Sequence, residues 1–141
     1  MIAGPCHHPG MARGDERDRL AVIAGSIRLA SGVSFLVSPK AASRLWGSDP
    51  DDNPTASLLL RSMGYRDALV GAMLLRSGLR DDTPTAGWFL ASAGADLADL
   101  VGGIANHDRL PARSRTVGIG GAGVGIGVGL LGAARAARAA R

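Results

Sequence analysis

Charged side chains lie inside three long apolar stretches of this sequence, and their chemistry is the first feature to explain. Residues 58–75 carry two arginines and one aspartate, residues 18–37 carry an arginine in their middle, and residues 83–106 carry two aspartates. A charge inside an apolar helix is costly unless an opposite charge pairs with it. We therefore expect one polar cluster built from several helices. Its members are Arg28, Arg61, Tyr65, Arg66, Asp67, Asp96 and Asp99.

The charged members of this cluster can neutralise one another, since three are cations and three are anions. The expected pairs are Arg66 or Arg61 with Asp96 or Asp99, and Asp67 with Arg28 or with the hydroxyl group of Tyr65. A balanced set of buried ion pairs is typical of a structural network that holds helices in one register. The first interpretation is therefore structural.

The second interpretation is a site for a small ligand or a proton. Asp96 and Asp99 are three residues apart, so they lie one turn apart on the same face of a helix. Two neighbouring carboxylates resist being ionised together, so the pair could hold a proton, relay it or polarise an oxygen atom of a ligand. An alternative in the same class is a membrane enzyme, or a redox accessory subunit, that uses this pair. The sequence leaves open whether the protein is an enzyme.

We expect no cofactor and no metal site. Two aspartates without an inward-facing His or Cys make a poor zinc site. The Cys-His-His run at residues 6–8 could bind a soft metal, but we expect residues 1–15 to be a disordered tail, in which Met11 is an alternative start. The acidic run at residues 49–53 lacks the closing Glu of a calcium-binding loop. No phosphate loop, dinucleotide fingerprint or Ser–His–Asp set occurs.

Four long helices are expected to position the cluster. Proline and glycine residues mark their ends, and the predicted helices span residues 18–37, 54–78, 83–106 and 116–134. The last helix is free of charge over 19 residues, which is enough to cross the hydrocarbon core of a membrane. Between the first two helices, residues 40–47 predict a short amphipathic segment. Its Trp46 would lie either at a membrane boundary or packed against the bundle.

Small residues dominate the apolar composition and favour close helix packing in lipid. The chain is 46% hydrophobic with only 4% aromatic residues, and it contains 21 glycines. Glycines spaced by four residues allow helix backbones to approach each other closely in a membrane. We expect Gly121, Gly125 and Gly129 to form such a packing groove. A soluble helical bundle is the alternative, supported by a mean hydropathy of only +0.14.

These patterns predict an all-α fold, a four-helix transmembrane bundle with up-down-up-down topology. The expected domains are the tail 1–15, a membrane domain at 16–135 and a basic C-terminal tail at 136–141. Both termini should lie in the cytoplasm, because the side that carries them has eight arginines and the other side has five basic residues. We expect a multi-pass protein of the cell membrane.

Expected partners are the lipid bilayer and either a second copy of the chain or another membrane subunit. Nucleic acid is not expected, although the formal net charge is +4. The arginines lie between apolar runs, and few aromatic side chains are present to stack on bases.

Three groups of residues resemble a known family. They are Arg28 and Gly32 followed by Pro-Lys and Arg-Leu-Trp-Gly segments, then Arg61, Gly64, Arg66, Asp67 and Gly71, then Asp96 and Asp99. This pattern, over residues 20–131, resembles small bacterial four-helix membrane proteins of unknown function that are similar to the DoxX-like group. The resemblance implies a four-helix membrane fold in which the Arg–Asp block and the two later aspartates recur. It implies no established activity.

Overall fold

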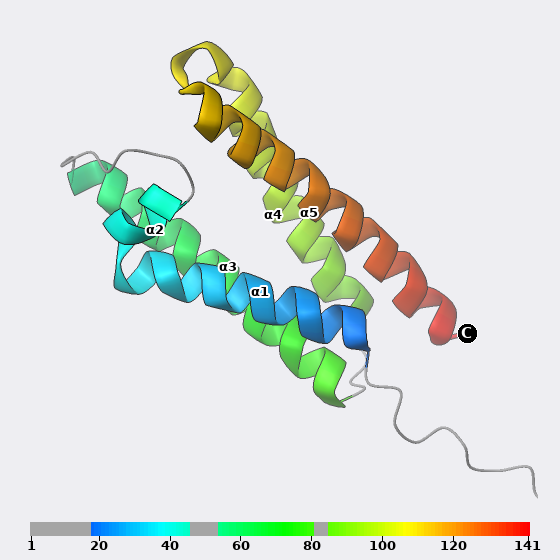
Figure 1. The fold of residues 1–141 in the computed structure, drawn as a ribbon. Coiled ribbons are helices and arrows are strands. Elements are labelled where there is room, and N and C mark those ends of the chain that lie inside the picture. The colour runs from blue at the N-terminus through cyan, green and yellow to red at the C-terminus, as the bar shows by residue number, and fades with distance from the viewer. Residues whose placement is uncertain (1–17, 46–53, 81–84) are drawn as a thin grey trace, which may run out of the picture.

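A computed structural model describes residues 18–45, 54–80 and 85–141, and all regular secondary structure within these ranges is helical (Figure 1). The elements are α1 (Arg19–Val37), α2 (Pro39–Leu45), α3 (Pro54–Arg80), α4 (Thr85–Ala105), the short 3₁₀ helix η1 (His107–Arg109) and α5 (Ala112–Ala139). The all-α class is therefore confirmed for the described part of the chain. The expected tail 1–15, Trp46 and the acidic run 49–53 lie outside the described residues.

Local sequence signals account for most helix ends. The side chain of Asp18 caps α1 by accepting hydrogen bonds from the backbone N–H groups of Leu20 and Ala21, at 3.1 and 3.2 Å. Pro39 ends α1 and begins α2, the expected segment between the first two long helices. By contrast, α5 starts four residues earlier and ends five residues later than the expected 116–134. Its flanks are rich in Ala and Arg, which are strong helix formers.

The α1 and α3 helices pack as a close antiparallel pair. Gly25 and Gly32 on α1 and Gly64 and Gly71 on α3 are each spaced by seven residues, which is about two helical turns. A Cβ atom at Gly64 would lie 2.7 Å from the carbonyl oxygen of Gly32, and one at Gly71 would lie 2.9 Å from that of Gly25. The absence of side chains therefore allows the two backbones to touch.

A second antiparallel pair consists of α4 and α5. A Cβ atom at Gly129 would lie 2.8 Å from that of Ala93, and Gly132 packs against the ring of the fully buried Phe89. Gly125, from the expected groove, packs against the carboxylate of Asp96. Gly125 and Gly129 of that groove thus pack against α4 of the same chain, whereas Gly121 is exposed.

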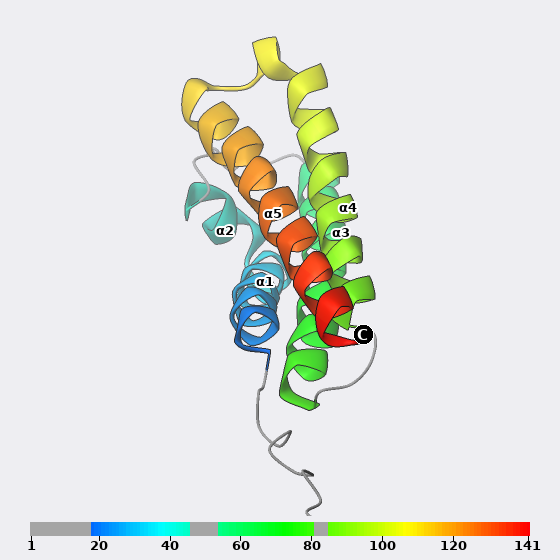
Figure 2. The same cartoon turned by 90° about the vertical axis from the view of Figure 1, so that its right-hand side faces the viewer.

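The two pairs meet at the end of the molecule where α3 leads towards α4. A small core of Ala21, Leu74, Phe89 and Ala133 joins all four long helices there. Away from this core the pairs separate, with η1 and α2 on different arms (Figures 1 and 2). Few apolar contacts therefore hold one pair against the other over the rest of their length.

The described helices have the character of membrane-spanning segments. By length and composition α1, α4 and α5 can each cross a membrane. The 27-residue α3 is long enough, but it carries five charged residues and does not qualify by composition. Every long helix exposes large apolar side chains, with exposed fractions of 67% for Ile27, 68% for Leu58, 59% for Val101 and 68% for Val124. Such surfaces are typical of a membrane protein.

Candidate functional site

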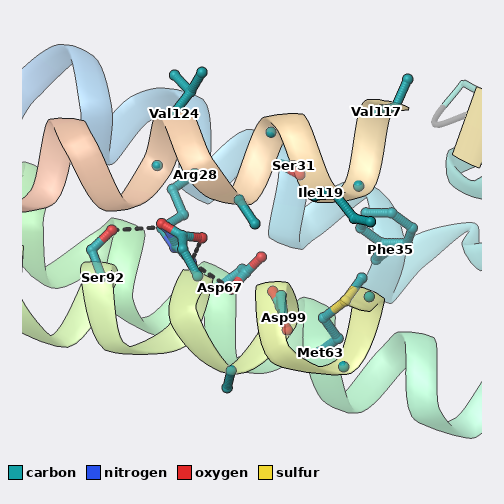
Figure 3. A pocket seen from close by; sticks show the side chains of 18 of the residues that line it. Arg28, Ser31, Phe35, Met63, Asp67, Ser92, Asp99, Val117, Ile119 and Val124 are labelled. Atoms are coloured by element: carbon teal, nitrogen blue, oxygen red, sulfur yellow. Dashed lines mark hydrogen bonds and ion pairs between the residues drawn. The ribbon is translucent and has the colours of Figure 1, made fainter. Parts of the chain in front are cut away.

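The guanidinium group of Arg28 joins α1 to both α3 and α4. Its Nη2 and Nη1 atoms donate to the two carboxylate oxygens of Asp96 on α4, at 2.8 and 2.9 Å. Nη1 also donates to the hydroxyl oxygen of Ser92 at 2.7 Å, and Nη2 to Oδ1 of Asp67 on α3 at 3.3 Å (Figure 3). Only 13% of the Arg28 side chain and 12% of that of Asp96 are exposed. This is a buried, bidentate ion pair, which is a strong and specific geometry.

A second arginine extends this arrangement. Arg66 on α3 donates from Nη2 and Nη1 to the two carboxylate oxygens of Asp99 on α4, at 2.7 and 3.2 Å. Its Nε atom donates to Oδ1 of Asp67 at 3.2 Å, the same oxygen that Arg28 binds. Asp67 therefore links the two arginines. We call this set the Arg–Asp network, and its members are Arg28, Arg66, Asp67, Asp96 and Asp99.

Two expected members of the cluster lie elsewhere. The side chains of Arg61 and Tyr65 are exposed, and Tyr65 is 63% exposed. The two residues are four apart, so they share one face of α3, and that face is turned away from the other helices. Asp96 consequently binds Arg28 rather than either arginine of α3.

The exclusion of Arg61 changes the charge of the site. The network contains two guanidinium cations and three carboxylate anions, so its formal charge is −1. The neutral set of six charges expected from the sequence does not form. An unbalanced charge between apolar helices is unfavourable unless a proton or an external cation compensates it.

Two small residues of the α4–α5 pair support the network. Ser92 lies one turn before Asp96 and accepts a hydrogen bond from Arg28, a role that sequence reasoning did not assign. The spacing of the sequence could have predicted this role, because Ser92, Asp96 and Asp99 lie along one stripe of α4. Gly125 supplies the space that the Asp96 carboxylate occupies, since a Cβ atom there would lie 3.2 Å from Oδ1 and closer still to Oδ2.

A cavity of about 680 Å³ lies between the two helix pairs, beside the network. Its walls are mostly apolar, and its charged lining residues are Arg28, Asp67, Asp96 and Asp99. Figure 3 shows Arg28, Asp67 and Ser92 towards one end of the cavity and Phe35, Met63 and Ile119 towards the other. The volume falls within the roughly 300–1,000 Å³ that is usual for small-molecule pockets.

The geometry separates the two aspartates of α4 chemically. Asp96 is buried and paired with Arg28, whereas Asp99 is 39% exposed and paired with Arg66. Each carboxylate thus has its own guanidinium partner. Within the described ranges, no three His, Cys, Asp or Glu side chains form a group suited to a metal ion.

A comparison with curated proteins and a comparison with solved structures each found no match. A family model described as a domain of unknown function (DUF4267) matches residues 25–134. The matched range begins within α1, ends within α5 and includes the whole Arg–Asp network. The chain therefore belongs to the DUF4267 family, whose description assigns no function.

Proposed function

We propose that the protein is a multi-pass protein of the cell membrane whose Arg–Asp network joins two helix pairs beside a cavity that binds a small ligand. In this proposal α1, α3, α4 and α5 all cross the bilayer as a four-helix, up-down-up-down bundle. The observation that carries the proposal is the Arg28–Asp96 ion pair, in which buried charges from two apolar helices meet beside the cavity. Ionisable groups at membrane depth usually face one another and serve a function.

The argument that α3 also crosses the membrane rests on its neighbours. The charges of Arg66 and Asp67 are paired within the network, so they need no water. The helix is packed against α1 through its glycines, and it exposes Leu58 and Leu69 towards its surroundings. The charges of α3 outside the network, Arg61, Arg76 and Arg80, are exposed and lie within about two turns of an end of the helix, from which arginine side chains can extend to the membrane surface.

The proposed orientation places both termini in the cytoplasm. The basic residues on that side are Arg13, Arg17, Arg19, Arg76, Arg80, Arg135, Arg138 and Arg141. Those on the other side are Lys40, Arg44, Arg109, Arg113 and Arg115. An excess of basic residues favours the cytoplasmic side. The membrane domain would comprise residues 16–135, flanked by a tail at 1–15 and a basic segment at 136–141.

The network has a structural and a ligand-binding role in this proposal. The pairs Arg28–Asp96 and Arg66–Asp99 each connect one helix pair to the other, so they define how the pairs align. The carboxylates of the same network line the cavity. A bound molecule would therefore contact the side chains that hold the helix pairs together.

No observation of this structure favours the alternative of a membrane enzyme or redox accessory subunit. A homo-oligomer, or a complex with another membrane subunit, is proposed from the sequence alone. Such an interface would have to use a surface other than Gly125 and Gly129, which contact α4. Kinship with DoxX-like proteins is likewise proposed from the sequence motifs.

Fractionation of cells that express a tagged chain, followed by an alkaline carbonate wash, tests the membrane part of the proposal. We expect the protein to stay in the membrane pellet. Cysteine labelling from outside spheroplasts then tests topology, with single cysteines introduced at Arg109 and Arg138 of a chain that carries Cys6→Ser. Labelling at position 109 alone is expected, and release of the protein by carbonate would overturn the proposal.

A further inference from the structure

We propose that the cavity selects a substituted ammonium ion with an apolar body. This inference rests on the proposed ligand-binding role of the cavity and names the chemical class of its ligand. It follows from the charge of the lining, from the oxygen atoms that remain accessible there, and from the size and polarity of the walls.

The charge of the lining favours a cation. Three aspartates and one arginine are its charged residues. The Nη atoms of Arg28 already donate to Asp67, Ser92 and both oxygens of Asp96, and its remaining donor, Nε, is buried, so Arg28 is poorly placed to bind an anionic ligand as well. Arg66, which compensates part of the acidic charge, is not on the lining. The network as a whole has a formal charge of −1, which one monovalent cation would neutralise.

Asp99 is the carboxylate best placed to receive the cation. Its side chain is 39% exposed, compared with 12% for Asp96 and 15% for Asp67, and it lines the cavity. Hydroxyl groups of Ser31 and Ser92 lie on the same lining. An ammonium group can donate charge-assisted hydrogen bonds to such oxygens.

The walls favour an organic cation over a bare metal ion. A volume of about 680 Å³ far exceeds what a single ion requires, and it lies within the roughly 300–1,000 Å³ of small-molecule pockets. The lining beyond the carboxylates includes Phe35, Met63 and Ile119. These side chains would cover a compact hydrocarbon body and exclude water from it.

The ammonium group could come from a free lipophilic amine or from a membrane lipid with an ethanolamine headgroup. Both would place the same charged group beside Asp99 and an apolar portion against the walls. The test below separates these two sources after it establishes the selection for charge.

Three probes with one hydrocarbon cage test this selection: 1-adamantylamine, 1-adamantanol and 1-adamantanecarboxylate. Binding is measured by isothermal titration calorimetry on the purified full chain in dodecyl maltoside at pH 7. We expect saturable binding of the amine and no binding of the carboxylate. The alcohol should bind at least about 10-fold more weakly than the amine, because it lacks the charge that interacts with Asp99. Asp99→Asn should weaken amine binding by about 10-fold or more.

The matched control is Asp108→Asn, which removes the same charge from a fully exposed side chain outside the cavity lining. It should leave amine binding unchanged. Ile119→Trp fills the cavity without changing charge and should weaken binding of the amine and the alcohol alike. If Asp99→Asn fails to fold, this second variant still shows whether the probes enter the cavity.

Equal binding of amine and alcohol, or amine binding unaffected by Asp99→Asn, would overturn the selection for a cation while leaving the cavity a ligand site. Failure of all three probes to bind would overturn the inference. It would leave the membrane part of the proposed function standing, because the carbonate wash tests that part separately. Competition of the bound amine by phosphatidylethanolamine, but not by phosphatidylglycerol, would assign the ammonium group to a lipid. Absence of competition would assign it to a free amine.

Discussion

Both carboxylate oxygens of Asp96 on α4 accept hydrogen bonds from the guanidinium group of Arg28 on α1, across 68 residues of sequence. These two helices belong to different antiparallel pairs, α1 with α3 and α4 with α5. The glycine contacts hold each pair together internally, but they do not join one pair to the other. The ion pair, the neighbouring Arg66–Asp99 pair and the small core at one end therefore decide how the two halves fit together.

Asp96→Asn should lower the free energy of unfolding by about 1.5–3 kcal/mol, because the buried Arg28 would lose its bidentate charged partner and keep only the longer ion pair with Asp67. Unfolding of the purified protein in detergent measures the change. Asp108→Asn is the control and should leave stability unchanged, since that side chain is fully exposed. Equal stability of the two variants would show that the buried pair does not hold the helices together.

Arg66→Gln should lower the free energy of unfolding by less than Asp96→Asn does, because the Arg66 and Asp99 side chains are 34% and 39% exposed, whereas those of Arg28 and Asp96 are 13% and 12% exposed. Arg61→Gln removes the same charge from an exposed position of α3 outside the network. We expect it to leave the unfolding transition unchanged. A loss with Arg61→Gln as large as that with Arg66→Gln would contradict the assignment of network membership.

Gly125→Ala should destabilise the fold by about 1–3 kcal/mol, because the added methyl group would overlap the Asp96 carboxylate and displace it from Arg28. Gly123→Ala is the matched substitution two residues away, where no atom lies within 4 Å of the new Cβ. It should stabilise the helix by about 0.5–1 kcal/mol. Thermal unfolding of both variants in one detergent tests the difference in sign.

Gly71→Ala should separate α1 from α3, since its Cβ atom would lie 2.9 Å from the backbone carbonyl carbon of Arg28. The shift would move Arg28 relative to Asp96, so we expect a loss of stability of about 1–3 kcal/mol. Gly94→Ala on α4 meets no atom within 4 Å and serves as the control. Similar melting temperatures for the two variants would argue against close packing of α1 on α3.

Much of the architecture is predictable from local features of the sequence. Pro39 marks the end of α1, and the apolar runs identify the four long helices. The cost of a charge in an apolar helix predicts that charges from different helices meet, and the structure brings Arg28, Arg66, Asp67, Asp96 and Asp99 together. The ends of α5 were less predictable, because runs of Ala and Arg extend a helix beyond its apolar part without any capping residue.

The sequence by itself determined the helices and the chemical types in the network, because periodicity, helix-ending residues and the cost of unpaired charge act locally or through composition. Only the tertiary structure decided that Asp96 pairs with Arg28, that Arg61 stays outside, and that a cavity with an acidic lining remains. Those outcomes depend on which face each helix turns towards its neighbours. Close contacts at Gly25, Gly71 and Gly125 set these faces, and each contact requires the backbone of one helix to meet a different helix.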